Sequence, residues 1–175
     1  MDTMQAIFGR YSYRGMYKPE PVPRETLKKI MEAGLAAPSG CNTQTTSLIG
    51  LDDARLIGAV SASLDSPHFA SAPAAVCVLT QRIPGYADVY FNVQDYAAAI
   101  ENILLAVTEL GYASCWIEGQ VTGDAKTQAD MAAALGVPDG YEVVAYLPIG
   151  VPAKDGPRAS KKPFESRAWF NGYGK

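Results

Sequence analysis

The stretch from Asn92 to Leu110 constrains the fold of this chain more than any other, because its length and composition predict one long helix. Its apolar residues are spread around most of the helical circumference, and Gly111 supplies a stop signal. A helix that is apolar nearly all round must be covered on most of its faces. The chain therefore builds its core around this helix, which lies either at the centre of one subunit or partly at an interface between two.

The remaining pattern alternates helices with strands. Further helices are expected over residues 3–8, 24–36, from Asp52 or Asp53 to 64, and 122–136; strands are expected over residues 47–51, 74–80, 113–118 and 142–149. This alternation is typical of the α/β and α+β classes. Residues 150–175 show no periodicity, and so long an irregular segment is hard to place on one subunit. We expect a single domain, residues 1–175, whose segment 150–175 is an arm that contacts a partner subunit.

Composition excludes several classes of protein. The chain has 175 residues, 48% of them hydrophobic, which is enough to bury a core. A net charge of -3 argues against a general nucleic-acid binder. No apolar run approaches the roughly 18 residues of a membrane span, and the N-terminus lacks the pattern of a secretory signal. The expected compartment is the reducing cytoplasm, and neither nucleic acid nor membrane is an expected partner.

Side chains that carry chemistry by themselves are scarce. The three cysteines form no CxxC pair, and Cys77, inside an apolar run, is expected to be buried. The single histidine, His68, is expected in a loop before a strand, and we favour a structural over a catalytic role for it. No metal-ligand cluster, nucleophile elbow, GxGxxG or phosphate-loop motif occurs. A cofactor must therefore bring any difficult chemistry.

Two polar clusters suggest which cofactor. In the segment Arg10-Tyr11-Ser12-Tyr13-Arg14, an extended backbone turns both guanidinium groups and the Ser12 hydroxyl to one side. Arginine binds phosphate through two parallel hydrogen bonds, although an isolated pattern of this kind is more often a solvated charged turn.

The second cluster is the turn-rich segment Ala37-Pro38-Ser39-Gly40-Cys41-Asn42-Thr43-Gln44. Its two side-chain amides, on Asn42 and Gln44, can donate and accept hydrogen bonds at once. Taken alone, a segment of this kind is more often only a loop that ends a helix. Together, the clusters favour a ligand with an anionic tail and a polar heterocycle, and a phosphorylated flavin fits that description.

These clusters belong to an ordered set of motifs that resembles the nitroreductase family of FMN-dependent oxidoreductases. The segment from Arg10 to Arg14 matches the family's RxSxR element, and residues 37–44 resemble its APSxxNxQ loop. The other matching segments are Asp95 to Gly111, which resembles the central helix, the strand and loop GYASCWIEG at 111–119, LPIGVP at 147–152 and KKP at 161–163. The resemblance covers nearly the whole chain, in order.

The resemblance implies an α+β fold in which helices sandwich a central, mostly antiparallel sheet, with two subunits intertwined as a homodimer and FMN at their interface. The FMN-binding positions that it implies are Arg10, Tyr11, Ser12, Arg14, Pro38, Ser39, Asn42, Gln44, Ile117, Glu118, Gly119, Lys161 and Lys162.

The resemblance also implies a role for each group of these residues. Arg10, Ser12 and Arg14 hold the phosphate and ribityl end, and Lys161, with Lys162 beside it, completes the phosphate clamp. Asn42 and Gln44 come from the partner subunit, while the backbone of 117–119 lies near the flavin N5. No catalytic side chain is implied, because the flavin carries the redox step.

The activity that follows is reduction of electron-poor acceptors, such as nitroaromatics or quinones, by ping-pong hydride transfer from NAD(P)H. Two alternatives stay open: an FMN-binding storage, sensing or flavin-consuming protein without such turnover, and a structural dimer with a vestigial site. The first alternative is motivated by Thr45-Thr46, which stand where the family loop often continues Pro-Trp. The segment 83–91 is also compact, and its aromatics, Tyr86, Tyr90 and Phe91, either line the pocket or pack within the loop.

Overall fold

A computed structural model describes residues 2–64 and 66–175. At its centre lies a three-stranded antiparallel sheet with the order β1-β2-β3, formed by β1 (Thr46–Leu51), β2 (Ala74–Thr80) and β3 (Glu142–Ile149). All seven residues of β2 are buried, as its uninterrupted apolar sequence predicts for a central strand. The predicted bounds of β2 and β3 are confirmed, and β1 begins one residue earlier than expected.

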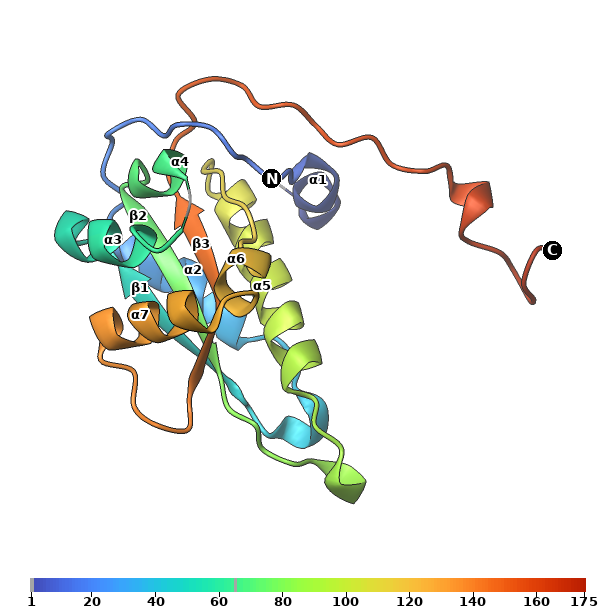
Figure 1. Cartoon of the computed structure of the whole chain (residues 1–175). Coiled ribbons are helices and arrows are strands. Elements are labelled where there is room, and N and C mark those ends of the chain that lie inside the picture. Colours follow the sequence, from blue (N-terminus) through green and yellow to red (C-terminus); the bar gives the residue numbers. More distant parts are fainter. Residues whose placement is uncertain (1, 65) are drawn as a thin grey trace.

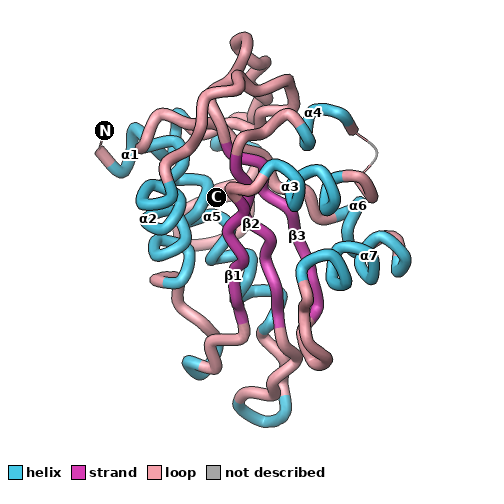
Figure 2. The backbone as a smooth tube through the Cα atoms, turned by 90° about the vertical axis from the view of Figure 1, so that its left-hand side faces the viewer, coloured by secondary structure: helices cyan, strands magenta, loops and turns pink. Residues whose placement is uncertain are grey.

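Helices cover both faces of the sheet (Figures 1 and 2). On one face lie α2 (Arg24–Leu35) and α5 (Asn92–Glu109); on the other lie α3 (Ala54–Ser61), α4 (Pro67–Ala70), α6 (Gly119–Thr122) and α7 (Ala125–Leu135). The side chains of β2 alternate between the layers, so that Val76 and Val78 pack toward α5 while Cys77 packs toward α3 and α7. The prediction of an antiparallel sheet sandwiched by helices is therefore confirmed, and Cys77 is buried as expected.

The long helix α5 is only partly covered by its own chain. Ile100, Ile103 and Val107 are almost completely buried in the core beneath the sheet. Val93 nevertheless remains 54% exposed, and Leu105 is only half-buried. The helix α1 (Thr3–Gly9) packs beside the C-terminal end of α5, outside the two helical layers that cover the sheet. Both locations considered for this helix, the centre of a subunit and the edge of an interface, are compatible with this arrangement.

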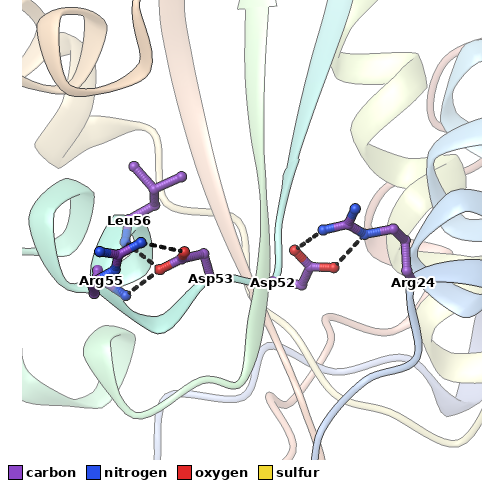
Figure 3. Close-up of polar contacts among 5 residues, drawn as sticks. All are labelled: Arg24, Asp52, Asp53, Arg55 and Leu56. Atoms are coloured by element: carbon purple, nitrogen blue, oxygen red, sulfur yellow. Dashed lines mark hydrogen bonds and ion pairs between the residues drawn. The ribbon is translucent and has the colours of Figure 1, made fainter.

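Two adjacent carboxylates join β1 to the helices on either side of it (Figure 3). Asp52 accepts two hydrogen bonds of 2.6 Å from the guanidinium of Arg24, at the start of α2. Asp53 is the N-cap of α3 and accepts from the backbone N–H groups of Arg55 and Leu56. The hydrogen bonds from Arg24 and Arg55 hold the pKa values of Asp52 and Asp53, respectively, below their usual range. The cap is thus Asp53, and the helix ends at Ser61 rather than at the predicted residue 64.

The segment 113–118 does not form the strand predicted for it. It makes isolated bridges with three different parts of the chain instead: Ser114 with Ser12, Ala113 with Gly150, and Ile117 with Tyr146. A ladder needs one continuous partner, and this segment changes partner every few residues. Its backbone therefore serves as a junction between the N-terminal segment, β3 and the start of the C-terminal arm.

Two further predictions are wrong at the level of single elements. The expected helix over 122–136 is instead α6 followed by α7, which begins at Ala125 because the Asp124 side chain caps it through the N–H groups of Lys126 and Thr127. His68 lies in the short helix α4 and not in a loop.

The C-terminal arm, residues 150–175, runs away from the body (Figure 1). It contains one 3₁₀ turn, Phe164–Ser166, and leaves Phe164, Phe170 and Tyr173 exposed. Among the described residues, no helix is both long and apolar enough to cross a membrane.

Candidate functional site

A groove of about 1000 Å³ lies between the N-terminal segment and the C-terminal arm. Residues 7–16 form one wall and residues 153–161 form the other. Five of the charged residues that line it are cationic (Arg10, Arg14, Lys154, Arg158 and Lys161), and only Asp155 is acidic. This excess of positive charge is what an anionic ligand requires.

The N-terminal wall is held in an extended conformation by the junction segment. The backbone N–H of Tyr13 donates to the carbonyl of Ser114 over 2.9 Å, and Ser12 and Ser114 form a parallel bridge. The Tyr13 ring is buried, and its hydroxyl donates to the carbonyl of Met16. Because side chains alternate along an extended backbone, burying Tyr13 leaves Arg14 exposed at the groove.

The two arginines of this wall differ in their surroundings. The Nε of Arg10 lies 3.2 Å from Oε1 of Glu101 on α5, so its charge is already paired. Within residues 2–64 and 66–175, Arg14 makes no hydrogen bond or ion pair. Arg14 is therefore a cation with no carboxylate partner among the described residues, and it lines a groove that is rich in positive charge.

The C-terminal wall is anchored by Arg158, which sequence reasoning did not single out. Its Nη1 donates to the carbonyl of Gly9, and its guanidinium lies 4.6 Å from the centre of the Tyr11 ring. The loose basic group from Lys154 to Arg167 was the available signal, but nothing in the sequence says which of its members meets an aromatic ring.

Of the two lysines predicted to clamp a phosphate, only Lys161 lines this groove. Lys162 faces a separate hollow of about 440 Å³, which it shares with Phe164, Arg167 and Ala168 of the arm itself.

The loop at 117–119 offers unpaired backbone donors. Ile117 is buried, whereas a Cβ placed on Gly119 would meet no atom within 4 Å, so Gly119 borders open space. In the part of the chain that the structure describes, the N–H groups of Glu118 and Gly119 have no hydrogen-bond partner. The Tyr96 hydroxyl donates to Glu118 over 2.7 Å, and burial together with this carboxylate raises the pKa of Tyr96, which keeps the hydroxyl a donor.

Two buried polar atoms near this loop also lack partners among the described residues: the indole Nε1 of Trp116 and the hydroxyl of Ser114. A buried donor without an acceptor costs free energy, and a bound ligand can supply the missing acceptor. None of residues 114–119 lines the groove itself, but their free donors together with the groove's cations fit an elongated, polar and phosphorylated ligand such as FMN.

The second polar cluster, residues 37–44, is called the amide loop after its side-chain amides. It lies at the N-terminal end of α5, away from the groove (Figure 1). Gly40 of this loop contacts Asp95, whereas Gly9, beside the groove, lies against Thr108. The thirteen residue steps from Asp95 to Thr108 correspond to about 20 Å along a helix. The structure thus gathers Arg10, Tyr11, Ser12, Arg14 and Lys161 in one groove, and it leaves Pro38, Ser39, Asn42 and Gln44 away from it.

The amide loop is held in an unusual conformation. Cys41, Asn42 and Gln44 have φ values of 53°, 55° and 50°, in the left-handed region that favours glycine. Phe91 packs against Gly40, where there is no room for a Cβ, so Phe91 packs within the loop, while Tyr86 is 82% exposed. Asn42 and Gln44 are both exposed, and within the described residues their side chains make no hydrogen bond.

Comparison with known proteins identifies the family. The sequence matches the nitroreductase family model over residues 7–65 and 53–151, which together span most of the chain. The chain belongs to the nitroreductase family. The resemblance inferred from the motifs is thereby confirmed.

Individual relatives agree with this assignment. A protein of Archaeoglobus fulgidus named NADH dehydrogenase/NAD(P)H nitroreductase is 30% identical over 154 residues, which cover 86% of each chain. An FMN-dependent nitroreductase from Clostridium difficile R20291 superposes with a TM-score of 0.81 at 26% identity, covering 97% of this chain and 99% of that one. A BluB-like flavoprotein from Clostridium difficile 630 superposes with a TM-score of 0.83, also at 26% identity and with the same coverage.

Proposed function

We propose that this member of the nitroreductase family is an FMN-dependent oxidoreductase that passes hydride from NAD(P)H to electron-poor acceptors, such as nitroaromatics or quinones, in a ping-pong cycle. The observation that carries the proposal is Arg14, an unpaired cation in a groove with five cationic side chains and one acidic one. A relative described as an FMN-dependent nitroreductase, similar over nearly the whole chain, supports it.

The chain's own residues would bind and orient the cofactor. Arg14 and Lys161 would hold the phosphate, with Ser12 beside them and Arg10 supporting the wall from its pair with Glu101. The free N–H groups of Glu118 and Gly119 would donate to the ring, beside the open space at Gly119. Bound FMN supplies the hydride-accepting and hydride-donating centre, so no side chain needs to act as acid or base.

The proposal includes a homodimer. About 20 Å of α5 separates the amide loop from the groove, so we expect Asn42 and Gln44 to reach the FMN held by Arg14 from a second copy of the chain. The single domain 1–175 would use its arm, residues 150–175, to contact that copy. The exposed Phe8, Phe170 and Tyr173 support this assignment, since large aromatic side chains gain stability when they are buried.

A second candidate is a protein that binds FMN for storage, sensing or consumption, without turnover of such acceptors. It is favoured by Thr45, which is buried against Asp95 instead of shaping a pocket, and by the structural similarity to a flavoprotein not named as a nitroreductase.

Anaerobic titration separates these candidates. Purified protein reconstituted with FMN should be yellow, should bleach with NADH or NADPH, and should regain its colour when a nitroaromatic or quinone is added. Yellow protein that neither donor bleaches would favour the second candidate, and protein that binds no FMN would refute both.

Arg14→Ala tests the phosphate grip. We expect at least a tenfold weaker affinity for FMN with an unchanged melting temperature, because Arg14 is exposed and makes no hydrogen bond or ion pair within the described chain. Lys28→Ala is the control: it removes a cation on α2 that is 64% exposed and does not line the groove, and it should leave FMN affinity unchanged.

A further inference from the structure

The side chain of Asp95, in the first turn of α5, is 4% exposed and faces the amide loop. Its Oδ1 accepts the backbone N–H of Gly40 over 2.7 Å, and its Oδ2 accepts the hydroxyl of Thr45 over 2.7 Å. The Thr43 hydroxyl lies 3.5 Å from Oδ2. Burying a carboxyl group is unfavourable unless hydrogen bonds compensate it, and here every compensating donor comes from one loop.

The two short contacts of Asp95 bracket the strained part of that loop. Gly40 precedes and Thr45 follows the three residues with positive φ, namely Cys41, Asn42 and Gln44. Non-glycine residues keep this conformation only where their surroundings determine it. Contacts within the loop, such as the hydrogen bond from the Gln44 N–H to the Ser39 hydroxyl, also help to hold this conformation. Asp95 therefore supplies the connection between the strained loop and the rigid helix.

The first turn of α5 also contacts the loop of residues 84–91. The backbone N–H of Asp95 donates to the carbonyl of Phe91 over 2.8 Å, and the Phe91 ring covers Gly40. The Cys41 sulfur accepts the backbone N–H of Tyr86 over 3.3 Å. The loops 38–45 and 84–91 are thus packed together, and Asp95 contacts both.

We propose that Asp95 is a positioning residue: it holds the loop 39–45 in the strained conformation that presents the amides of Asn42 and Gln44 to a ligand bound mainly by the second subunit. The identity of that ligand rests on the proposed function, whereas the hold on the loop does not. Both amides are exposed and, among the described residues, free of hydrogen bonds. They are therefore available to bind a ligand and are not needed to hold the loop together.

The two simplest substitutions at this position separate charge from hydrogen bonding. In Asp95→Asn, the amide oxygen can accept from Gly40 while the amide nitrogen donates to the Thr45 oxygen, so the shape and both contacts are kept. In Asp95→Ala, the Gly40 N–H and the Thr45 hydroxyl lose their partner inside the protein. A positioning role therefore predicts a large effect of alanine and substantial rescue by asparagine.

The matched control is Asn102→Ala, two turns further along the same helix. The Asn102 side chain donates to the carbonyl of Ala33 over 3.1 Å and joins α5 to α2 away from the amide loop. Losing this bond should lower global stability without releasing the loop.

The experiment uses the full-length protein and two readouts. The first is hydrogen exchange of the flavin-free protein at the N–H groups of Asn42, Thr43 and Gln44, which bond within the loop and do not contact Asp95. The second is the dissociation constant for FMN. In Asp95→Ala, we expect loop exchange at least tenfold faster and FMN binding at least tenfold weaker. Asp95→Asn should stay within about threefold of the wild type on both, and Asn102→Ala should change neither.

Three results would overturn the proposal: loop exchange unchanged in Asp95→Ala, loop exchange raised equally in Asn102→Ala, or a released loop with unaltered FMN affinity. If Asp95→Ala does not fold, Thr45→Val, which keeps the side-chain shape and removes one of the two short bonds, takes its place and must release the same amides. If the wild type binds no FMN, the proposed function fails, and the exchange readout alone decides whether Asp95 holds the loop.

Discussion

The sheet and the C-terminal arm both carry large apolar side chains, but the sheet buries them and the arm leaves them exposed. Strands β2 and β3 bury almost every residue, and Tyr146 in β3 is completely enclosed. In the arm, Phe170 is 73% exposed and Tyr173 is 86% exposed, and the arm's aromatic rings contact mainly one another. The sheet obtains its stability from its own chain, whereas the arm needs another surface. The groove lies between the N-terminal segment, residues 7–16, and the arm, so the candidate site depends on where the arm lies.

The largest expected effect comes from the body of the molecule. Ile100 on α5 is completely buried between the sheet and α2, and Ile100→Ala should lower the free energy of unfolding by about 2–5 kcal/mol. Urea denaturation followed by circular dichroism measures this loss. The matched arm substitution, Phe164→Ala, should change the same quantity far less. Equal losses at the two positions would remove the distinction between body and arm.

A second test uses the thiols enclosed in the body. Burial raises the pKa of Cys77 to about 12 and that of Cys115 to about 11. In the unfolded chain these thiols deprotonate near pH 9, so between pH 9 and 11 only the unfolded state loses protons and stability must fall as pH rises. Each thiol contributes a slope of up to about 1.4 kcal/mol per pH unit in that window.

Urea midpoints at pH 8 and pH 10 check this expectation. The double substitution Cys77→Ala and Cys115→Ala should flatten the decline between pH 9 and 10, before the buried Tyr17 and Tyr146, whose pKa values burial also raises, contribute. The arm contains no cysteine, so removing it should not alter the slope. A wild type equally stable at both pH values would contradict the burial of the two thiols.

The division between body and arm also explains what could be predicted from the sequence. The bounds of β2 and β3 were predicted correctly because a continuous apolar run ended by polar or turn-forming residues is a local signal. The segment 113–118 was misassigned because its three bridging partners, at residues 12, 146 and 150, are remote in sequence.

The candidate site was predictable to a different extent. The motif residues Arg10, Ser12, Arg14 and Lys161 do gather in one groove, although no local pattern states that Arg10 is paired with Glu101. The role of Asp95 was not predicted, because a carboxylate near the start of a helix usually faces solvent and interacts favourably with the helix dipole. Its burial depends on the loop 39–45 folding back over it, which is a tertiary event.

A smaller effect is expected where the arm meets the body. Arg158→Ala removes the stacking on Tyr11 and the hydrogen bond to Gly9, and it should weaken FMN binding about fivefold, equivalent to about 1 kcal/mol. Limited proteolysis should cut the arm faster in this variant. Arg158→Lys keeps the charge but loses the planar group, so an intermediate result would assign the effect to stacking. Unchanged proteolysis would show that Arg158 does not anchor the arm.

The smallest effect on folding, and the sharpest test of the comparison, is expected from Phe170→Ala. In one chain this ring is mostly exposed and contacts Phe164 within the arm, so the substitution should change the unfolding free energy of dilute, dissociated protein by less than about 0.5 kcal/mol. If the arm packs on a second subunit, the same substitution should raise the dimer dissociation constant at least tenfold, because a large aromatic side chain would leave an interface. Sedimentation equilibrium of wild type and variant measures that constant. An unchanged dissociation constant would show that Phe170 does not pack on a second subunit. Contacts elsewhere on the chain would then have to bring Asn42 and Gln44 to the groove.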